Sequence, residues 1–372
     1  MIVLVSKIIK ISEIIAESGG NSKIGALLRN VQVRFGGCQI YWDLKGRTDV
    51  TDIIRLKEGS SIACCSQLKP ILNLIGDGRI ILESHTALSG ISIEKNVQPV
   101  RDKPTAASFA MKVEGNKVRL SNLDINGSCN YGILVVDSQG IKFKYCKLDG
   151  FKIACLTIRD SSFMIDNVVS SNSRHGIHLL GSHGLVKHCS SLRNRRHGFT
   201  IVHCPEPIVV KSCISMENIG NGFVFGGSKR SLASNKGWRI TGCVARNNSG
   251  NGFSIDPTLA GKDDAITQNG GIENCVSLEN LQHGFYITHA RNVSVTNCTA
   301  NRNNNAGIAV SKSRDITVNM STTIGNFKTE IAFYGGHVEG TGGYIVKKHK
   351  NMLKEDDVSY KILPPFGIFI RD

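Results

Sequence analysis

Histidine side chains gather between residues 175 and 289 of this 372-residue sequence. Seven of the 11 histidines fall in or beside short segments in which Gly is followed by Phe or Ile, and these are His175, His178, His183, His197, His203, His283 and His289. Tyr286 and Asp256 belong to the same segments. Imidazole, phenol and carboxyl groups are side chains that transfer protons in enzymes. These residues are therefore the candidates for acid–base chemistry, and the elements that carry them decide whether they can act together.

A repeated phrase connects these segments: Cys, five residues later Asn, four residues later Gly, and then Phe or Ile. An earlier copy places Asn167 in the cysteine position and continues with Asn172 and Gly176. The spacings between successive Asn residues are 22, 24, 30, 32 and 23, so a period near 22 carries two insertions. Such a period indicates a solenoid of stacked units. The five full copies begin at Cys189, Cys213, Cys243, Cys275 and Cys298.

Each unit contains short stretches rich in β-branched residues, such as 208–210 and 293–295, which is the pattern of β-strands. Units this short cannot bury an apolar face alone, so they must stack with strands about 4.8 Å apart. The Asn and Gly of each phrase are expected at turns that need left-handed or strained backbone. Equivalent residues then form ladders, and we expect an internal stack of Phe199, Phe223, Phe253 and Phe285 beside the five cysteines.

The stacked cysteines are interpreted as core packing, because an unpaired Cys behaves as a small hydrophobe. The 12 cysteines contain no Cys-x-x-Cys pair that would indicate a zinc or redox motif. A run of unpaired thiols is typical of proteins made in a reducing compartment.

This pattern resembles the right-handed parallel β-helices of the pectate-lyase-like superfamily, which includes polysaccharide lyases, polygalacturonases, uronan epimerases and phage tailspikes. The resemblance covers residues 165–326 and extends back to about residue 107. It implies an all-β fold: a right-handed single-stranded parallel β-helix, which is a solenoid, with an N-terminal capping helix. The catalytic signatures of the polygalacturonases and the calcium-site pattern of the pectate lyases are absent. Asp256-Pro257 is followed by Thr258, so the Asp-Pro-His motif of mannuronan epimerases is also missing. The resemblance therefore predicts a fold and leaves the reaction open.

Four parts of the chain follow from this interpretation. Residues 1–30 form the N-terminal cap and lead-in, and residues 31–106 form irregular early coils. Residues 107–326 form the regular β-helix, and residues 327–372 form a C-terminal coil or cap, or an oligomerisation tail. The cap helix is expected at residues 6–18, where one helical stripe ends at two glycines and consists of Ile8, Ile11, Ile14 and Ile15.

Alternation along the strands assigns two positions of each unit to the outer surface. The residue before Gly gives the row Tyr131, His175, His197, Asn221, Asn251, His283 and Ala306. The second residue after Gly gives the row Leu134, His178, Thr200, Val224, Ser254, Tyr286 and Ala309. An elongated polar face of this kind suits a chain-like ligand, because successive sugars can contact successive coils.

The predicted catalytic residues are Tyr286, His283, Asp256 and His197. Tyr286 and His283 could serve as acid and base, since lyases and epimerases remove a C5 proton and protonate the opposite face or the leaving oxygen. Asp256 could instead pair with Asp263 or Asp264 for glycoside hydrolysis, which needs two carboxyl groups. The structural alternatives are a solvated strand face and, for Asp256, a turn before Pro257. A metal site built by histidines on neighbouring coils is a further alternative, although no spacing within one strand fits it.

The predicted substrate contacts are Lys229, Arg230, His178, His203, His289 and Arg196. Lys229 and Arg230 lie in the first insertion, residues 226–238, and the second insertion spans residues 256–271. Both insertions follow Gly-Phe strands, so we expect them to form a wall beside the outer face. Their positive charge suits an acidic chain.

The composition limits the partners. The net charge of +15, from 45 Lys and Arg against 30 Asp and Glu, favours a polyanion, which we expect to be an acidic polysaccharide. No nucleic acid is expected, because no basic run is interleaved with aromatic residues. No membrane span is expected, because no window approaches 18 apolar residues. No cofactor is expected, with calcium left open as the alternative.

The first five residues are too short for a signal peptide, so a virion tail or the cytoplasm is the expected location. The apolar segment 362–370 is expected to cap the last coil or to pack between the subunits of a homotrimer. The expected function is degradation of an acidic polysaccharide by β-elimination or hydrolysis, as in a phage tailspike or depolymerase. The alternatives are an adhesin or structural β-helix without chemistry, and a uronan C5-epimerase.

Overall fold

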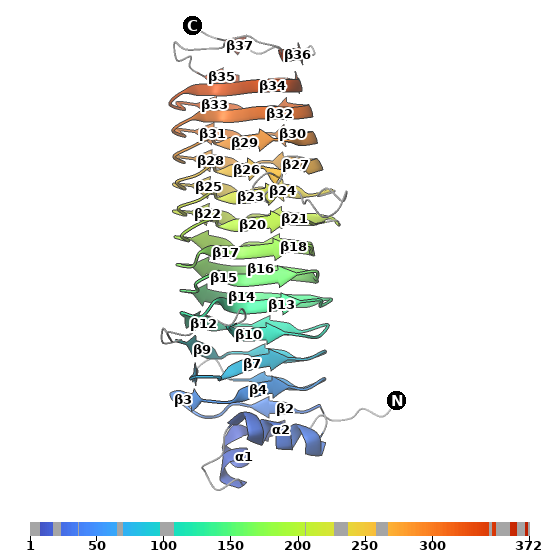
Figure 1. Ribbon diagram of the computed structural model, residues 1–372, viewed down its shortest axis with the longest axis vertical. Coiled ribbons are helices and arrows are strands. Elements are labelled where there is room, and N and C mark those ends of the chain that lie inside the picture. Colours follow the sequence, from blue (N-terminus) through green and yellow to red (C-terminus); the bar gives the residue numbers. More distant parts are fainter. Residues whose placement is uncertain are drawn as a thin grey trace. The chain divides into compact units, whose positions relative to one another are not determined.

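The computed structural model describes residues 8–17, 24–35, 37–64, 70–96, 108–204, 206–226, 237–257, 267–341, 344–346, 358–362 and 369–370. The chain divides into two compact units: unit 1 is Met1–Ser173 and unit 2 is Arg174–Asp372. In each unit the described strands pair in parallel and lie above one another in chain order (Figure 1). The prediction of a parallel β-solenoid is confirmed, whereas the fourfold division of the chain stays a prediction.

Unit 1 contains two helices, α1 (Ile11–Glu17) and α2 (Ile24–Phe35), and three stacks of strands among its described residues. The first stack consists of β4 (Ile53–Leu56), β7 (Arg79–Leu82), β10 (Phe109–Val113), β13 (Tyr131–Val136) and β15 (Ala154–Arg159). The second consists of β1 (Ile8–Lys10), β2 (Gln39–Tyr41), β5 (Ser61–Ala63), β8 (Ala87–Ser89), β11 (Arg119–Ser121) and the first parts of β14 (Ile141–Asp149) and β16 (Ser162–Ser171). The third consists of β3 (Arg47–Val50), β6 (Ile71–Leu74), β9 (Ser92–Lys95), β12 (Asp124–Gly127) and the second parts of β14 and β16.

Unit 2 repeats this arrangement as three sheets within its described residues. The first sheet consists of β17 (His175–Leu180), β20 (Phe199–Val202), β23 (Phe223–Gly226), β26 (Phe253–Ile255), β29 (Phe285–Thr288) and the first parts of β32 (Ala306–Asn319) and β34 (Thr329–Thr341). The second consists of β18 (His183–Lys187), β21 (Ile208–Lys211), β24 (Arg239–Thr241), β27 (Thr267–Glu273), β30 (Ala290–Thr296), the second parts of β32 and β34, and β36 (Val358–Ile362). The third consists of β19 (Ser190–Leu192), β22 (Ile214–Met216), β25 (Val244–Arg246), β28 (Val276–Leu278), β31 (Thr299–Asn301), β33 (Thr322–Ile324), β35 (Tyr344–Val346) and β37 (Phe369–Ile370).

The N-terminal cap differs from the expected single helix. Ile8 lies in strand β1 and is exposed, so the helical stripe begins only at Ile11 in α1. The helix α2 was not predicted, and its buried Leu28 adds to the apolar cover of the first coils. The Asp52 carboxylate accepts hydrogen bonds from the backbone N–H groups of Gly25 and Ala26 at the start of α2, which satisfies two unpaired donors of that helix. Neither of the described helices has the length and apolarity needed to cross a membrane.

The predicted aromatic ladder is confirmed in unit 2. The stacked rings are separated by 4.7 Å for Phe199 and Phe223, and by 4.9 Å for the next two pairs, Phe223–Phe253 and Phe253–Phe285. The five cysteines of the phrase are buried thiols, as predicted. Burial raises the pKa of the Cys213 thiol, which keeps it in the inert protonated form.

A second ladder, of buried asparagines, runs beside the first. Each Nδ2 donates to the Oδ1 of the asparagine on the next rung over 2.9–3.0 Å, and each Oδ1 also accepts the backbone N–H of the preceding asparagine. The last side chain, Asn326, donates to the buried Glu330 carboxylate over 2.6 Å. The members of this asparagine ladder are Asn194, Asn218, Asn248, Asn280, Asn303 and Asn326.

The residue before each ladder asparagine, rather than the asparagine itself, has the left-handed conformation. The expected left-handed backbone at the asparagines is therefore wrong by one position. The earliest copy of the phrase is shifted in the same way: Asn172 is exposed with a φ of 54°, and Ser173 is the buried residue. Asn167 likewise has a φ of 54°, and Val168 fills the buried position that the phrase gives to Cys. The residues with φ between 51° and 57° before the ladder are Arg193, Glu217, Asn247, Glu279 and Arg302.

The glycines of the phrase serve a different purpose from the expected one. A Cβ atom at Gly252 would lie 2.1 Å from Ser277 Oγ, and one at Gly284 would lie 2.4 Å from the Gly307 carbonyl oxygen. Close packing of neighbouring rungs therefore excludes any side chain here. This packing brings the residues on both sides of each glycine close to the next coil.

The apolar segment 362–370 joins the sheets where it is described. Strand β36 pairs with β34 and β37 pairs with β35, both in parallel. Where it is described, this segment therefore adds strands to the sheets, whereas its packing between the subunits of a trimer stays a prediction. Residues 363–368 lie outside the described residues.

Candidate functional site

The outer face of the first sheet of unit 2 carries the residues that the sequence selected. Parallel pairing places equivalent residues in register, as it does for Ser254 and Tyr286. These two residues belong to a row of equivalent positions, one on each rung. All members of the row are buried except His178 and Tyr286, which are half-buried. The predicted register of the row is confirmed, and we call it the outer row: His178, Thr200, Val224, Ser254, Tyr286, Ala309 and Ala332.

A second row, which we call the ladder row, consists of His197, Asn221, Asn251 and His283. Each side chain accepts the backbone N–H of the next rung: Asn221 N donates to His197 Nδ1 over 3.0 Å, and Ala306 N donates to His283 Nδ1 over 3.2 Å. Asn221 and Asn251 accept in the same way through Oδ1. Because Nδ1 accepts, the neutral imidazoles carry their proton on Nε2. The alternative of a solvated strand face is wrong here, since His197, Asn221 and Asn251 are buried.

Three imidazoles form a cluster on the first two rungs. The His175 ring stacks on His178 with centroids 5.2 Å apart, and it lies 5.5 Å from His197. His175 Nδ1 is 3.2 Å from the Thr200 hydroxyl. Burial lowers the pKa of His175 to about 3 and that of His197 to about 4, with further contributions from the neighbouring rings and the Arg196 guanidinium. The buried imidazoles His175 and His197 are therefore neutral at physiological pH.

Tyr286 and His283 lie together three rungs beyond His197, about 14 Å along the stack at the usual strand spacing. Their rings stack with centroids 5.2 Å apart and an interplanar angle of 14°. Tyr286 also packs on a small cluster of buried alanines, Ala306, Ala309 and Ala332. No hydrogen bond joins the Tyr286 hydroxyl to another described residue. Unlike His283, this phenol can therefore transfer a proton without breaking a hydrogen bond of the fold.

A cation and a carboxamide complete this site. His283 Nε2 lies 3.1 Å from the Asn305 side-chain amide. Burial, followed by the positive charge of Lys328, lowers the pKa of His283 to about 4. His283 is therefore a neutral hydrogen-bonding group near an exposed ammonium, which is an arrangement suited to a carboxylate ligand.

Sequence reasoning missed Asn305 and Lys328. They belong to a third row, which precedes the ladder row by one residue and whose backbone bonds include Asn305 N to Gln282 O, 3.1 Å, and Lys328 N to Asn305 O, 3.4 Å. The signal was present for Asn305, which stands directly before Ala306 in a full copy of the phrase, as Gln282 stands before His283. We call it the rim row, and its members are Arg196, Gly220, Gly250, Gln282, Asn305 and Lys328. Arg196, predicted as a substrate contact, is exposed at one end of it.

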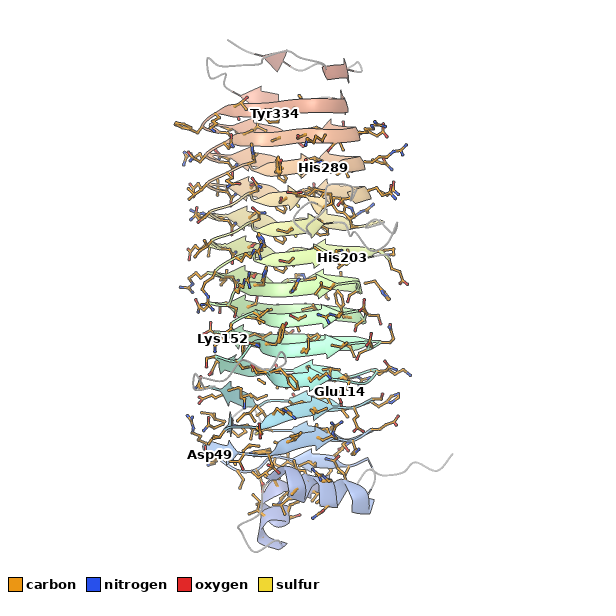
Figure 2. The ribbon with its side chains drawn as sticks, in the orientation of Figure 1. Asp49, Glu114, Lys152, His203, His289 and Tyr334 are labelled. Atoms are coloured by element: carbon orange, nitrogen blue, oxygen red, sulfur yellow. The ribbon has the colours of Figure 1, made fainter. Side chains whose placement is uncertain are left out.

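His203 and His289 lie at a corner of the coil, four residues after Phe199 and Phe285. Both have left-handed backbone, with φ values of 61° and 48°. Figure 2 shows them on the same side of unit 2. His289 Nδ1 is 3.0 Å from the Thr288 hydroxyl. Both residues are half-buried and follow the strands of the candidate face, so they stay predicted substrate contacts at its edge.

Asp256 is buried at the end of β26, and its backbone N–H donates to Phe225 O over 2.9 Å. Lys229, Arg230, Asp263 and Asp264 lie outside the described residues, as do most of the two insertions that were expected to form a wall. The pairing of Asp256 with a second carboxyl group and the basic contacts of the first insertion therefore stay predictions. Within the described part of the chain, no group of three or more His, Cys, Asp or Glu side chains is arranged to hold a metal ion.

Unit 1 has a separate shallow depression of about 420 Å³. Its lining includes Asp124, Lys147 and Asp149. Asp149 is engaged in packing the coil, because it accepts hydrogen bonds of 2.6 Å from both Ser171 Oγ and Asn172 Nδ2. The first sheet of unit 2 is therefore the better candidate for chemistry.

Comparisons with known proteins bear on the fold. The profile of the family described as "Right handed beta helix region" matches residues 15–184 and 264–350. No curated protein matches the sequence significantly.

Several solved structures are similar to the chain. The A-module of the mannuronan C-5 epimerase AlgE4 of Azotobacter vinelandii has 14% identity and a TM-score of 0.50, with 97% of this chain and 96% of that chain covered. The periplasmic alginate epimerase AlgG has 12% identity and a TM-score of 0.56, with 82% and 77% covered. Tailspike protein 3 of bacteriophage CBA120 has 12% identity and a TM-score of 0.53, with 97% and 62% covered. Identities this low show a shared fold and nothing more.

Proposed function

Since the chain belongs to the family of right-handed β-helix proteins, we propose that the first sheet of unit 2 binds an acidic polysaccharide and that Tyr286 transfers the proton in its cleavage. One observation carries this proposal: the Tyr286 phenol stacks on a neutral His283 beside the Lys328 cation. The mannuronan and alginate epimerases with similar structures support a glycan as ligand. The positive charge of the chain supports an acidic one.

The proposed reaction is β-elimination, because a single group, the Tyr286 oxygen, can carry the proton from C5 to the leaving oxygen. In its ionised form the Tyr286 oxygen takes the C5 proton of a uronate, and the electron pair of the C–H bond moves toward the carboxylate. The Nε2–H of His283 would hold the Asn305 carboxamide by its oxygen, and Lys328 together with the Asn305 N–H group would stabilise the charge that develops there. The bond from C4 to the glycosidic oxygen then breaks, a C4–C5 double bond forms, and the phenol returns the proton to the leaving oxygen. Epimerisation would need a second proton donor on the opposite face of the sugar, and it stays the alternative reaction.

The remaining predicted residues take supporting roles in this proposal. Arg196 and His197 would line the part of the face about 14 Å away along the stack, and His178 would lie one rung farther. Lys229 and Arg230 would add charge from the first insertion, and His203 and His289 would contact the edge of the chain. No cofactor takes part in the proposed reaction.

A panel of polymannuronate, polygalacturonate and neutral dextran tests the reaction class. A lyase produces both ultraviolet absorbance from unsaturated uronates and new reducing ends, whereas a hydrolase produces reducing ends alone. An epimerase exchanges deuterium from D2O into C5 without chain cleavage. A binder gives none of these signals but is retarded on a gel that contains the polymer.

The Tyr286→Phe variant tests the residue. It keeps the ring that stacks on His283, so we expect unchanged melting and nearly unchanged binding, with turnover about 10²-fold lower or more. Tyr334→Phe is the control, because it removes an exposed phenol elsewhere on the same sheet. Full activity in Tyr286→Phe would exclude the phenol as the proton-transfer group.

A second candidate is a glycan-binding protein without chemistry, such as a homotrimeric tailspike on a virion tail. The observation in its favour is the ladder row, in which the Nδ1 atoms of His197 and His283 serve backbone bonds. Polymer retardation without any product on the panel, together with a trimer mass in sedimentation, would support it. A monomer that cleaves a polyuronate would exclude it.

A further inference from the structure

Apolar side chains are exposed along one corner of unit 2. Ile219 is 65% exposed, Leu281 is 59% exposed and Phe327 is 70% exposed. Each directly follows an asparagine of the buried ladder in the sequence. Single exposed apolar residues are common on protein surfaces, but a set in structural register is informative.

The backbone fixes these three residues in one row. Ile219 N donates to Asn194 O over 2.9 Å, and Phe327 N donates to Asn303 O over 2.9 Å. The same bond joins Leu281 N to Asn248 O over 2.8 Å. Every rung therefore presents one residue at this corner, and the corner row is Arg195, Ile219, Ser249, Leu281, Asn304 and Phe327.

The apolar members of the corner row occupy every second rung. Ser249 separates Ile219 from Leu281, and Asn304 separates Leu281 from Phe327. At about 4.8 Å per rung, the apolar side chains repeat about every 9.6 Å. The fold repeats on every rung. The alternation of apolar and polar residues along the corner row is therefore a property of the sequence.

The corner row borders the candidate site. On each rung the corner residue stands two positions before the ladder-row residue in the sequence. Their Cα atoms therefore lie within about 7 Å of each other, as those of Leu281 and His283 do. Phe327 is followed by Lys328 of the rim row, and Arg195 is followed by Arg196. The apolar residues therefore continue the candidate site along a border that has cations at both ends.

We propose that Ile219, Leu281 and Phe327, which we call the corner stripe, bind the apolar faces of alternate sugars in an extended acidic polysaccharide. The proposal rests on the function proposed above and adds the conformation of the ligand. A sugar ring presents C–H groups on its faces, which aliphatic and aromatic side chains can remove from water. In an extended polymer whose successive sugars are turned over, every second sugar presents the same face. A contact on every second rung fits such a chain lying along the stack, with its carboxylates toward Arg196 and Lys328.

Affinity electrophoresis in polymannuronate and polygalacturonate tests this proposal. The variant combines Ile219→Ser, Leu281→Ser and Phe327→Ser, because Ser249 shows that the corner row accepts serine. We expect about tenfold weaker retention of the variant by the polymer, at low and high salt alike. A disaccharide reaches at most one residue of the stripe, so its binding should change less than threefold.

The control combines Ile214→Thr and Met320→Ser, which remove exposed apolar side chains elsewhere in unit 2. Thr322 occupies the position equivalent to Ile214, and Ser212 occupies the position equivalent to Met320. The repeat therefore already accepts both substitutions. Thermal melting shows that both variants are folded before binding is compared. The control should bind the polymer as the wild type does.

The outcomes separate this proposal from the proposed function. If the wild type binds or cleaves a polyuronate and the stripe variant behaves identically, the corner stripe is not a sugar contact and the proposed function stands. If the stripe variant alone changes its sedimentation mass and keeps its polymer affinity, the stripe is a contact between copies of the chain. If the wild type neither binds nor cleaves any polymer of the panel, the proposed function itself fails.

Discussion

Replacing His197 by Asn removes a titratable group from the ladder row and keeps the hydrogen bond that it accepts. Asn221 and Asn251 already perform this task on the following rungs, where Oδ1 receives the backbone N–H of the next coil. His197→Asn should therefore change the stability at pH 7 by less than about 1 kcal/mol.

The pH dependence of stability should change much more. Burial lowers the pKa of His197 from 6.5 to about 4, and the side chain is only 9% exposed. Between these two values the unfolded chain binds a proton that the folded chain does not, so stability falls as the pH falls. The difference in pKa corresponds to a loss of about 3 kcal/mol on going from pH 7 to pH 4. His175 adds a loss of the same sign, since burial lowers its pKa to about 3.

Urea unfolding followed by circular dichroism from pH 7 to pH 4 measures this effect. The His197→Asn variant should lose about 3 kcal/mol less than the wild type over this range. His188→Asn is the matched control, because His188 is exposed with left-handed backbone that Asn tolerates. Identical pH dependence in His197→Asn and the wild type would mean that His197 titrates normally, and a large loss at pH 7 would refute its place in the ladder row.

Three further predictions concern the ladders and the rim row. In a urea titration, Asn248→Ala should cost about 4–6 kcal/mol of unfolding free energy, because it leaves the buried Asn218 N–H without an acceptor and removes three other hydrogen bonds. The control Ser249→Ala should cost less than about 0.5 kcal/mol. Lys328→Gln should weaken retention by polyuronate about threefold to tenfold at low salt and little at high salt, whereas Lys211→Gln should have no effect. The ladder cysteines should resist a bulky thiol reagent until denaturant is added, and rapid labelling in the native state would contradict their burial: Cys189, Cys213, Cys243, Cys275 and Cys298.

The sequence was sufficient to predict the inner surface of unit 2. Phe199 and Phe223 stack as expected, because a phrase repeated in one register fixes which residues superimpose. The register of the outer row follows from the same argument, since a strand alternates its side chains strictly. Ser254 therefore meets Tyr286, although the second insertion lies between them in the chain.

The turn was harder to predict, because two positions there can carry the same residue type. Asn247 has left-handed backbone and is exposed, whereas Asn248 is buried in the asparagine ladder. Asn tolerates left-handed backbone and also makes good side-chain bonds, so residue type does not separate the two roles. This ambiguity shifted the earliest copy by one residue, at Asn172.

The candidate site was predicted only in part for a similar reason. The pairing of Tyr286 with His283 follows from their positions in the repeat. The burial of His197 and its bond to Asn221 do not, because they depend on how closely successive rungs approach. Lys328 was missed because it belongs to a rung whose Gly position is occupied by Glu330, so the phrase does not mark it.

The asparagine ladder has a consequence for how long the outer face of the first sheet of unit 2 can be. Every amide in it points the same way, from Asn194 toward Asn326, and the final donor meets the Glu330 carboxylate. Each rung therefore donates to its successor the same pair of hydrogen bonds that it accepts from its predecessor. A whole coil, such as the 23 residues that separate Asn280 from Asn303, could be duplicated or deleted without leaving any amide unmatched. The candidate face can thus be lengthened or shortened in steps of one coil, while Glu330 continues to end the series.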